Sequence, residues 1–341
     1  MRLLVTGGAG FIGANFVRYV LEETDDVRVT NLDALTYAGN LASLADVADD
    51  SRYRFEHGDV CDPEVVERLV ADADAIVHFA AESHVDRSID GPSAFLRTNV
   101  VGAGVVFDAA RRHEVDRCLH ISTDEVYGSI DAPDSFVETD PIEPNSPYSA
   151  SKASADLLAR AYTKTYGYPI TVTRTTNNFG PFHHPEKVIP LFITKLIDGG
   201  TVPLYGDGSN VRDWTYVRDN VAAQWLVLTQ GEPGEVYNVG AGNELSNKEL
   251  TYAILERFGL TGQAADARIE FVPDRPGHDL RYSVDASKVR ELGWSPTVAF
   301  EEALDATVAW YRVNEAWWRP LEAGGATARR GLARSDEGAD P

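Results

Sequence analysis

A glycine-rich turn near the start of the chain constrains the fold more than any other feature of the sequence. The apolar segment at 2–6 leads directly into Gly7-Gly8-Ala9-Gly10-Phe11-Ile12-Gly13, and a helical pattern follows at 11–23. Glycines at this spacing allow a tight turn between a strand and a helix, and they let the backbone approach a pyrophosphate at the helix N-terminus. Because strand, turn and helix come in this order, the segment predicts a dinucleotide-binding βαβ unit.

Short apolar segments alternate with helical patterns through the first half of the chain. The expected strands lie at 2–6, 27–32, 53–57, 75–80, 118–122 and 170–175, and the expected helices lie at 11–23, 62–71, 94–112 and 149–166. Such alternation is typical of a parallel sheet with helices on both faces. We therefore predict an α/β fold with a doubly wound parallel (Rossmann) sheet.

The rhythm changes after residue 180, where prolines and glycines separate shorter segments. A helical pattern at 219–229 and the strand Val236-Tyr237-Asn238-Val239-Gly240 then indicate a return to the main sheet. We predict a cofactor-binding domain over 1–180, rejoined by 210–240, and an interleaved, smaller α/β substrate-binding lobe within 181–320. Residues 322–341 show no apolar period and are expected to form a disordered tail.

Charge and composition exclude several classes of function. The 341 residues carry a net charge of −22, and only six of the 31 basic residues are lysines. Such a surface repels nucleic acid and anionic membranes, so we expect neither as a partner. The acidity is typical of proteins from a high-salt cytoplasm, where screening makes self-repulsion tolerable.

Two further absences in the sequence bear on location and metals. There is no run of eighteen apolar residues and no signal-peptide pattern, so we expect a cytoplasmic protein. Cys61 and Cys118 are too few for a disulfide framework, and we expect two buried thiols. No Cys or His pair has ligand spacing, so no metal site is expected.

Asp33 predicts which dinucleotide binds. It ends the second expected strand, twenty residues after Gly13, where a carboxylate accepts hydrogen bonds from the adenosine ribose and repels a 2′-phosphate. No Arg or Lys follows within several residues, so NAD is favoured over NADP. The next two strand ends fit the same cofactor through a carboxylate near the adenine and small residues along the dinucleotide. These residues are Asp59, Val60, Ala80 and Ala81.

Tyr148 and Lys152 form a candidate acid–base pair. They lie four residues apart at the start of an expected helix, so both side chains project from one face. A free tyrosine has a pKa of about 10, and a nearby ammonium together with a positive nicotinamide should lower it by roughly 1–3 units. Tyr148 would then take a hydroxyl proton while a hydride leaves the same carbon. The pair alone is common by chance and gains specificity only from its context.

That context is the end of the fifth expected strand, Ser122-Thr123-Asp124-Glu125-Val126-Tyr127-Gly128. With the glycine turn and the Tyr148/Lys152 pair, this segment makes the chain resemble the extended short-chain dehydrogenase/reductases. Thr123-Asp124-Glu125 is similar to the signature of their dTDP-glucose 4,6-dehydratase branch, and the resemblance covers about residues 1–315. It implies an enzyme that binds NAD and removes water from a nucleotide-linked hexose, without net consumption of the cofactor.

The chemistry of that branch explains the two adjacent carboxyl groups. Oxidation of the glucose at C4 acidifies the hydrogen on C5, so a base must remove that proton and an acid must protonate the departing C6 hydroxyl. Two carboxyl groups with separated pKa values can do both. The resemblance implies that Glu125 is the base and Asp124 the acid, with Thr123 and Tyr148 at the C4 oxygen. A hydride then returns to C6, and Glu125 reprotonates C5.

Other segments match the family locally, at 31–40, 81–89, 177–181 and 185–190. The resemblance implies that Ser83 contacts the glucose and that Asn178 and Lys187 lie at the diphosphate. Asn177 is assigned to the cofactor and Val188 to the substrate. His183-His184 departs from the family's pattern, and we expect both to be loop residues.

A nucleoside diphosphate also needs cationic donors, and the arginine fork suits it. Arg212 is the first candidate, and Arg275 and His278 follow. Tyr205 is a candidate for stacking on the base, and Asn247 for a hydrogen bond near it. In so acidic a chain, a surface ion pair is the competing explanation for each arginine.

Two alternatives remain open. UDP-glucose dehydratases and UDP-glucuronate decarboxylases share the turn, the Tyr/Lys pair and a nearby Glu, but would lack the full Thr-Asp-Glu run. A catalytically inactive relative that only binds NAD should have lost Tyr148, Lys152 or a carboxylate, and all are present. Thymine and uracil differ by one methyl group, worth about 1–3 kcal/mol in a fitted pocket, so the nucleobase stays undetermined.

The helices expected at 94–112 and 149–166 carry more apolar positions than one core-facing stripe requires. Members of the family commonly pair such helices into a four-helix bundle. We therefore expect a homodimer built on these two helices.

Overall fold

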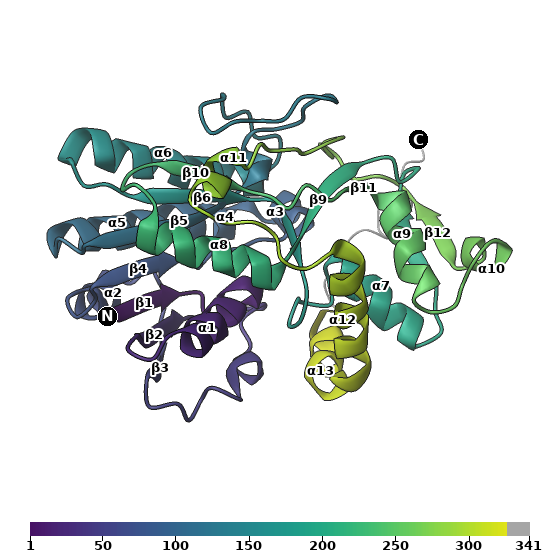
Figure 1. The fold of residues 1–341 in the computed structure, drawn as a ribbon, viewed down its shortest axis with the longest axis horizontal. Helices are drawn as coiled ribbons and strands as arrows, with labels where there is room; N and C mark the ends of the chain where they lie inside the picture. The colour runs from purple at the N-terminus through teal and green to yellow at the C-terminus, as the bar shows by residue number, and fades with distance from the viewer. Residues whose placement is uncertain (326–341) are drawn as a thin grey trace, which may run out of the picture.

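The computed structural model describes residues 1–325, and its main layer is a seven-stranded parallel sheet (Figure 1). The strand order is β10-β6-β5-β4-β1-β2-β3, which changes direction between β1 and β4. The strands are β1 (Arg2–Thr6), β2 (Arg28–Asp33), β3 (Tyr53–His57), β4 (Ala75–His78), β5 (Arg117–Thr123), β6 (Thr171–Thr175) and β10 (Val236–Val239). The predicted doubly wound α/β fold is confirmed. Ligands of such sheets bind where the strand order reverses.

Helices cover both faces of this sheet. One face carries α1 (Phe11–Glu23), α8 (Val217–Gln230) and α11 (Ser287–Glu291). The other carries α2 (Pro63–Val70), α5 (Ala103–Arg112) and α6 (Pro147–Tyr166). The helix expected at 94–112 is in fact three consecutive segments, α4 (Pro92–Phe95), the π-helical η2 (Leu96–Gly102) and α5, with α3 (Val85–Asp90) just before them.

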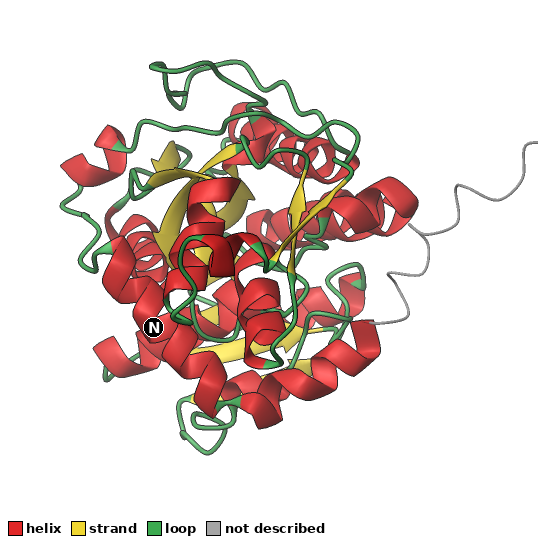
Figure 2. Cartoon of the chain, turned by 90° about the vertical axis from the view of Figure 1, so that its right-hand side faces the viewer, coloured by secondary structure: helices red, strands yellow, loops and turns green. Residues whose placement is uncertain are grey.

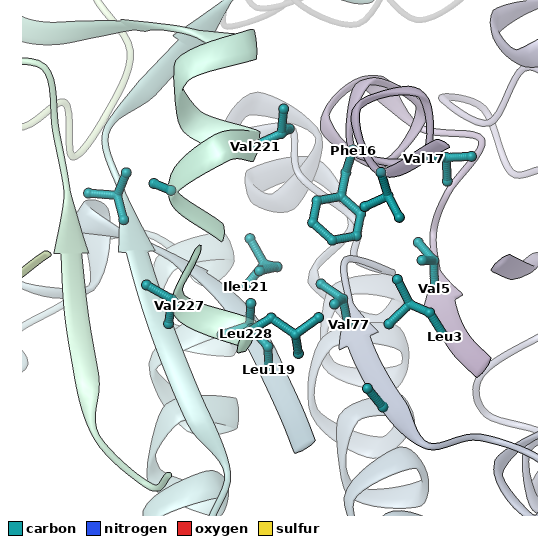
Figure 3. Close-up of a cluster of buried hydrophobic side chains, with 14 of the residues drawn as sticks. Leu3, Val5, Phe16, Val17, Val77, Leu119, Ile121, Val221, Val227 and Leu228 are labelled. Carbon is teal, nitrogen blue, oxygen red and sulfur yellow. The ribbon is translucent and has the colours of Figure 1, made fainter. Parts of the chain in front are cut away.

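The core follows from the period of two along each strand. Leu3 and Val5 of β1 point to the face covered by α1 and α8, whereas Leu4 between them points to the opposite face. Figure 3 shows Phe16 of α1 packed toward the apolar side chains of β1, β4 and β5. Because both faces are buried at the centre of the sheet, the central strands β1 and β4 are almost continuously apolar, as is typical of parallel sheets.

The remaining elements form a smaller lobe around two short sheets. One sheet has the order β11-β9-β7 and mixes antiparallel and parallel pairs, and the other pairs β12 with β8. Figure 2 turns this side toward the viewer and shows helices around the short strands. The elements are β7 (Asn177–Phe179), β8 (Val202–Tyr205), β9 (Val211–Tyr216), β11 (Glu244–Ser246), β12 (Ile269–Val272), α7 (Val188–Ile197), α9 (Asn247–Glu256), α10 (Gln263–Asp266), α12 (Phe300–Val313) and α13 (Glu315–Gly325).

Two details of the chain's path bear on the sequence predictions. β10 pairs in parallel with β6, so the strand expected at 236–240 does return to the main sheet. The tail expected at 322–341 was placed too early, because α13 continues to Gly325 and is held by tryptophan contacts with α12. Residues 326–341 of that predicted tail lie outside the described residues. Between residues 1 and 325, no helix has the length and apolarity needed to cross a membrane.

Candidate active site

A large cavity opens at the carboxyl ends of β1, β2, β4, β5 and β6, where the order of the sheet reverses. Every residue that the sequence assigned to the cofactor lines it, as does every residue assigned to catalysis. Of the substrate residues, Ser83, Asn178, Lys187 and Val188 also line it. The cofactor residues are Gly7, Gly10, Phe11, Ile12, Gly13, Asp33, Asp59, Val60, Ala80, Ala81, Tyr148, Lys152 and Asn177.

The glycine turn owes its shape to the absence of side chains. A Cβ at Gly13 would lie 2.3 Å from the carbonyl oxygen of Gly7, and a Cβ at Gly7 would lie 2.5 Å from the backbone nitrogen of Ala80. Gly7 also has a φ of +74°, which favours glycine. Gly10 is the N-cap of α1 and supplies no capping side chain, so the first N–H groups of the helix can donate to an anion.

Asp33 fixes the neighbouring loops while its carboxylate lines the cavity. It accepts hydrogen bonds from the backbone nitrogens of Ala9 (2.9 Å) and Leu35 (2.8 Å). Burial raises the pKa of Asp33, and these two donors oppose the rise. A helix N-terminus without a side-chain cap, a close glycine backbone and a buried carboxylate at the end of β2 together fit the pyrophosphate and adenosine ribose of NAD.

The Thr123-Asp124-Glu125 segment turns from β5 into a short 3₁₀ helix, η3 (Asp124–Val126). The hydroxyl of Thr123 accepts from the backbone nitrogen of Glu125 at 3.3 Å and donates to Oδ1 of Asp124 at 3.2 Å. Asp124 is only 3 % exposed, and its Oδ2 has no hydrogen-bond partner within residues 1–325. The segment therefore presents two adjacent carboxyl groups to the cavity, the buried one of Asp124 and the half-buried one of Glu125.

The surroundings of these two carboxyl groups differ. Burial, reinforced by the charge of Glu125, raises the pKa of Asp124 well above its usual value. Burial also raises the pKa of Glu125, but three cations nearby oppose that rise. These cations are Arg275, Arg212 and Lys187. Glu125 is thus better suited to carry charge, and Asp124 to hold a proton.

Tyr148 and Lys152 project from the first turns of α6, which begins with a capping box of Ser146 and Ser149. The Nζ of Lys152 donates to the carbonyl oxygen of Ile121 at 2.6 Å, and burial lowers the pKa of Lys152 to about 8. Burial, followed by the charges of Glu125 and Asp124, raises the pKa of Tyr148. The protein groups alone therefore raise this pKa, and the lowering expected from Lys152 together with a positive nicotinamide stays a prediction.

Lys187 and Asn178 approach the cavity from the segments that lead into the smaller lobe. The Nζ of Lys187 donates to the carbonyl oxygen of Ser83 at 2.8 Å, and burial lowers the pKa of this lysine. The Nδ2 of Asn178 donates to the hydroxyl of Thr175 at 3.0 Å, while its Oδ1 has no partner among the described residues. Val188 begins α7 at the same place.

The other predicted substrate residues do not line the cavity. Tyr205 and Arg275 share the carboxylate of Asp86, at 3.3 Å and 3.2 Å, and the ring of His278 lies 6.3 Å from that of Tyr205. Asn247 begins α9, and its backbone nitrogen donates to the carbonyl oxygen of Asn210.

Arg212, the first candidate for the diphosphate, is buried. It donates to the carbonyl oxygens of Val211 (2.7 Å) and Asp279 (2.9 Å) and lies over the ring of Tyr282. Among residues 1–325 it has no ion-pair partner within salt-bridge distance, and it acts on the carboxyl groups of η3 through space.

Several residues that line the cavity were missed. His183 and His184 were expected to be simple loop residues, but both are largely enclosed, and the ring of His183 stacks on Phe11 at 4.1 Å. Tyr37 lies under the guanidinium of Arg87, 3.9 Å from ring centre to Cζ. Tyr37 lies in the segment 31–40 that matches the family, but no spacing rule marks its side chain, and Trp317 is more than 300 positions away from the glycine turn. The missed lining residues include Thr36, Tyr37, Glu82, Phe182, His183, His184, Glu186, Trp317 and Leu321.

Comparisons with known protein sequences agree with this geometry. A family profile described as GDP-mannose 4,6 dehydratase matches residues 4–307. A dTDP-glucose 4,6-dehydratase from Streptomyces niveus is 54% identical over 94% of this chain and 96% of its own. The low-salt glycan biosynthesis protein Agl12 of Haloferax volcanii is 57% identical over 91% of this chain and 98% of its own.

Solved structures give the same result. The crystal structure of DesIV, a dTDP-glucose 4,6-dehydratase from Streptomyces venezuelae with NAD and TYD bound, superposes with a TM-score of 0.91 at 54% identity. The match covers 94% of this chain and 100% of that one. A UDP-glucose 4-epimerase from Thermus thermophilus in complex with NAD has a TM-score of 0.83 at 31% identity, over 92% of this chain and 100% of that one.

Proposed function

The chain belongs to the NAD-dependent epimerase/dehydratase family, in its dTDP-glucose 4,6-dehydratase branch, and from this premise we propose how its residues perform the reaction. The activity is that of a hydro-lyase, which converts dTDP-glucose to its 4-keto-6-deoxy product. One observation carries the proposal. Asp124 and Glu125 face the same buried cavity as Tyr148, Lys152 and the glycine turn.

The cofactor is NAD, and it lies along the carboxyl edge of the main sheet in our proposal. When bound, NAD takes a hydride from C4 of the hexose and returns it to C6. Asp33 holds the adenosine ribose, the turn ending at Gly13 receives the pyrophosphate, and Asp59 reaches the adenine. We assign residues 1–180 and 210–240 to this cofactor domain, and residues within 181–320 to the substrate lobe.

Three side chains carry the proton steps, and a fourth, Thr123, orients the substrate. Thr123 holds the C4 oxygen and Tyr148 accepts the C4 hydroxyl proton, so that C4 becomes a ketone. Glu125 takes the proton from C5, and Asp124 gives its proton to the C6 hydroxyl, which leaves as water. After the double bond between C5 and C6 has formed, Glu125 returns its proton to C5. The different surroundings of the two carboxyl groups support this division.

The state of Tyr148 adds a condition. Its pKa is raised by burial and by Glu125, so the phenol keeps its proton when only the protein's own charges act on it. Tyr148 therefore needs a further positive charge beside it before it can act as a base, and in our proposal this charge comes with the bound cofactor. In our proposal Lys152, whose Nζ donates to the carbonyl oxygen of Ile121, lies in the same cavity and adds its charge to that of the cofactor.

The substrate lies toward the smaller lobe in our proposal. Ser83 contacts the glucose, and Asn178, Lys187 and Val188 lie at the sugar end of the diphosphate. The far end of the nucleotide would reach Tyr205 and Arg275 around Asp86, with His278 and Asn247 beside them and Arg212 behind. This assignment is supported by the charges of Arg275 and Arg212, which act on Glu125 at the cavity.

Turnover of a panel of nucleotide sugars tests the function. We expect the purified protein with NAD to convert dTDP-glucose to a product with the ultraviolet absorbance of a 4-keto-6-deoxy sugar in base. UDP-glucose, UDP-glucuronate, CDP-glucose and GDP-mannose serve as comparisons, the last because of the family profile. Faster turnover of any of these than of dTDP-glucose would contradict the assignment, and absence of turnover with all of them would favour an NAD-binding protein without catalysis.

We also propose a homodimer through η2 and α6. These neighbouring elements leave large apolar side chains open to solvent in one chain, with Leu96 53 %, Val101 56 % and Leu157 56 % exposed. Such a patch is typical of a protein–protein interface. A dimer mass by light scattering is expected, and Val101→Lys with Leu157→Lys should yield monomers. Val313→Lys, at an equally apolar but distant position on α12, should leave the mass unchanged.

A further inference from the structure

The last described helix, α13, brings two side chains to the cofactor cavity. Trp317 and Leu321 lie four residues apart, and thus on one face of the helix, and both line the cavity that also contains Gly10 and Phe11. The adjacent Trp318 is fully buried in the core of the smaller lobe, and its Nε1 donates to the carbonyl oxygen of Tyr311 at 2.8 Å. Trp318 therefore anchors α13, while Trp317 is left to face the cavity.

Trp317 connects the two parts of the protein across the edge of this cavity. Its Nε1 donates at 3.1 Å to the hydroxyl of Ser43, a buried residue of η1 (Leu41–Leu44), which follows β2 in the cofactor-binding part. Its ring lies 5.6 Å from that of Phe182, in the segment that leads to α7, and 5.2 Å from that of Trp310. In Figure 1, α12 and α13 stand together beside α7 at the edge of the smaller lobe.

A series of ring contacts continues from Trp317 to the glycine turn. The guanidinium of Arg18, on α1, lies 4.1 Å over the ring of Phe182. His183 stacks on Phe11, the first residue of α1, and its carbonyl oxygen accepts a hydrogen bond from the hydroxyl of Tyr311 on α12. The two last helices are thus linked through Phe182 and His183 to α1, the helix whose N-terminus receives the pyrophosphate in our proposal.

We propose that α13 is a clasp that retains the cofactor, with Trp317 and Leu321 closing the wall of the cavity beside the glycine turn. This inference rests on the proposed function in one respect. A dehydrogenase must exchange its cofactor after every turnover, whereas a dehydratase that takes a hydride from C4 and returns it to C6 must not. An apolar wall tied to Ser43 slows dissociation, because the wall has to open before the dinucleotide can leave.

The test measures NAD release directly, without any sugar nucleotide. The full chain is loaded with radiolabelled NAD, an excess of unlabelled NAD is added, and bound label is followed by rapid gel filtration. We expect Trp317→Ala to release NAD about tenfold faster or more, because a large apolar contact is lost. Leu321→Ala and Ser43→Ala should show smaller increases of the same sign. Trp317→Phe, which keeps the ring but loses the bond to Ser43, should match Ser43→Ala.

A matched control separates the clasp from general loss of stability. Trp225 is a half-buried tryptophan of α8 that packs beside Phe16 and does not line the cavity. Trp225→Ala should lower the melting temperature without a change in NAD release.

Release at the wild-type rate from both Trp317→Ala and Leu321→Ala would overturn the proposal. If Trp317→Ala does not fold, Leu321→Ala and Ser43→Ala decide the matter, and normal release from both overturns it. If the variants release NAD faster as expected but the protein turns over no sugar nucleotide, the proposed function is contradicted and the proposal for α13 still holds.

Discussion

The cofactor end and the nucleotide end of the active site use different kinds of binding group. At the cofactor end, the binding groups are glycine backbone, the start of α1 and the carboxylates of Asp33 and Asp59, all within one cavity. At the nucleotide end, the candidates are long side chains such as Arg212 and Arg275, which the protein already holds on its own acceptors. A backbone site is formed as soon as the turn folds, whereas a side-chain site is formed only when distant segments meet.

The arginines at the nucleotide end also act on the catalytic carboxyl groups. Arg275 makes the largest opposing contribution to the raised pKa of Glu125, and Arg212 follows it. A cation at this end therefore has two effects, attraction of the diphosphate and stabilisation of the charged base. At the cofactor end Asp33 has a single effect, on the ribose. The following changes separate these effects.

The largest effect is expected from Glu125→Gln. The amide is nearly isosteric but cannot accept the C5 proton, so turnover should fall by about 10²–10⁴-fold, the range of a lost general base. Exchange of solvent deuterium into C5 should disappear, while oxidation at C4 persists in part. Asp124→Asn is the matched control, because it should block loss of the C6 hydroxyl and leave C5 exchange in place. Normal C5 exchange in Glu125→Gln would remove Glu125 from its role.

The second effect concerns Asp33. Wild-type protein should bind NAD and be activated by it, with NADP a poor substitute, because a buried carboxylate repels the 2′-phosphate. Asp33→Ala should lower the affinity for NAD by about tenfold to a hundredfold, the usual cost of one charged hydrogen bond. It should also reduce the ratio of the affinity for NAD to that for NADP. Asp59→Asn, which changes the other cavity carboxylate of this end, should leave the ratio of the two affinities unaltered. Equal activation of the wild type by both cofactors would contradict the prediction.

The third effect distinguishes the two functions of Arg275. Removal of this cation in Arg275→Leu should raise the pKa of Glu125 further, since Arg275 lowers it. The base must be deprotonated, so activity rises with pH through that pKa, and the acidic limb of kcat should move to higher pH. KM for the nucleotide sugar should increase about tenfold through loss of a charge-assisted contact. Arg275→Lys keeps the positive charge, so it should return the acidic limb of kcat closer to its wild-type pH than it returns KM to its wild-type value. If Arg275→Leu raises KM but leaves the acidic limb of kcat at its wild-type pH, Arg275 acts in substrate binding and does not affect the pKa of Glu125.

The same contrast explains what could be predicted from the sequence. The strands, the turn and the placement of Asp33 follow from local patterns, and the structure brings their residues to one edge of the sheet as expected. The raised pKa of Tyr148 was not foreseen, because it depends on burial and on carboxylates of another element. Trp317 and His183 were missed for a related reason. Their contacts join segments that are far apart in the chain, and no spacing rule records such contacts.

The smallest effect is expected from salt, and it concerns the whole surface rather than either end of the site. There are 53 acidic residues against 31 basic ones, so many carboxylates lack a cationic neighbour. The ion pairs that do form at the surface, such as Arg218 with Glu22 and Glu23, are each worth only about 0–1 kcal/mol. The unpaired charges repel one another over a Debye length of about 30 Å at 0.01 M salt and about 3 Å at 1 M.

Screening should therefore stabilise the fold and ease the approach of an anionic substrate. High salt also weakens contacts such as that of Lys187 with a diphosphate, but Lys187 is enclosed and screened less. We expect melting temperature and activity to rise from dilute to molar KCl, with roughly 1–2 °C for each kcal/mol gained in a chain of this length. Sucrose at matched osmolality is the control, because it favours compact states without screening charge. A steady fall of both quantities across that range, or an equal gain in sucrose, would show that self-repulsion of the acidic surface does not limit this protein.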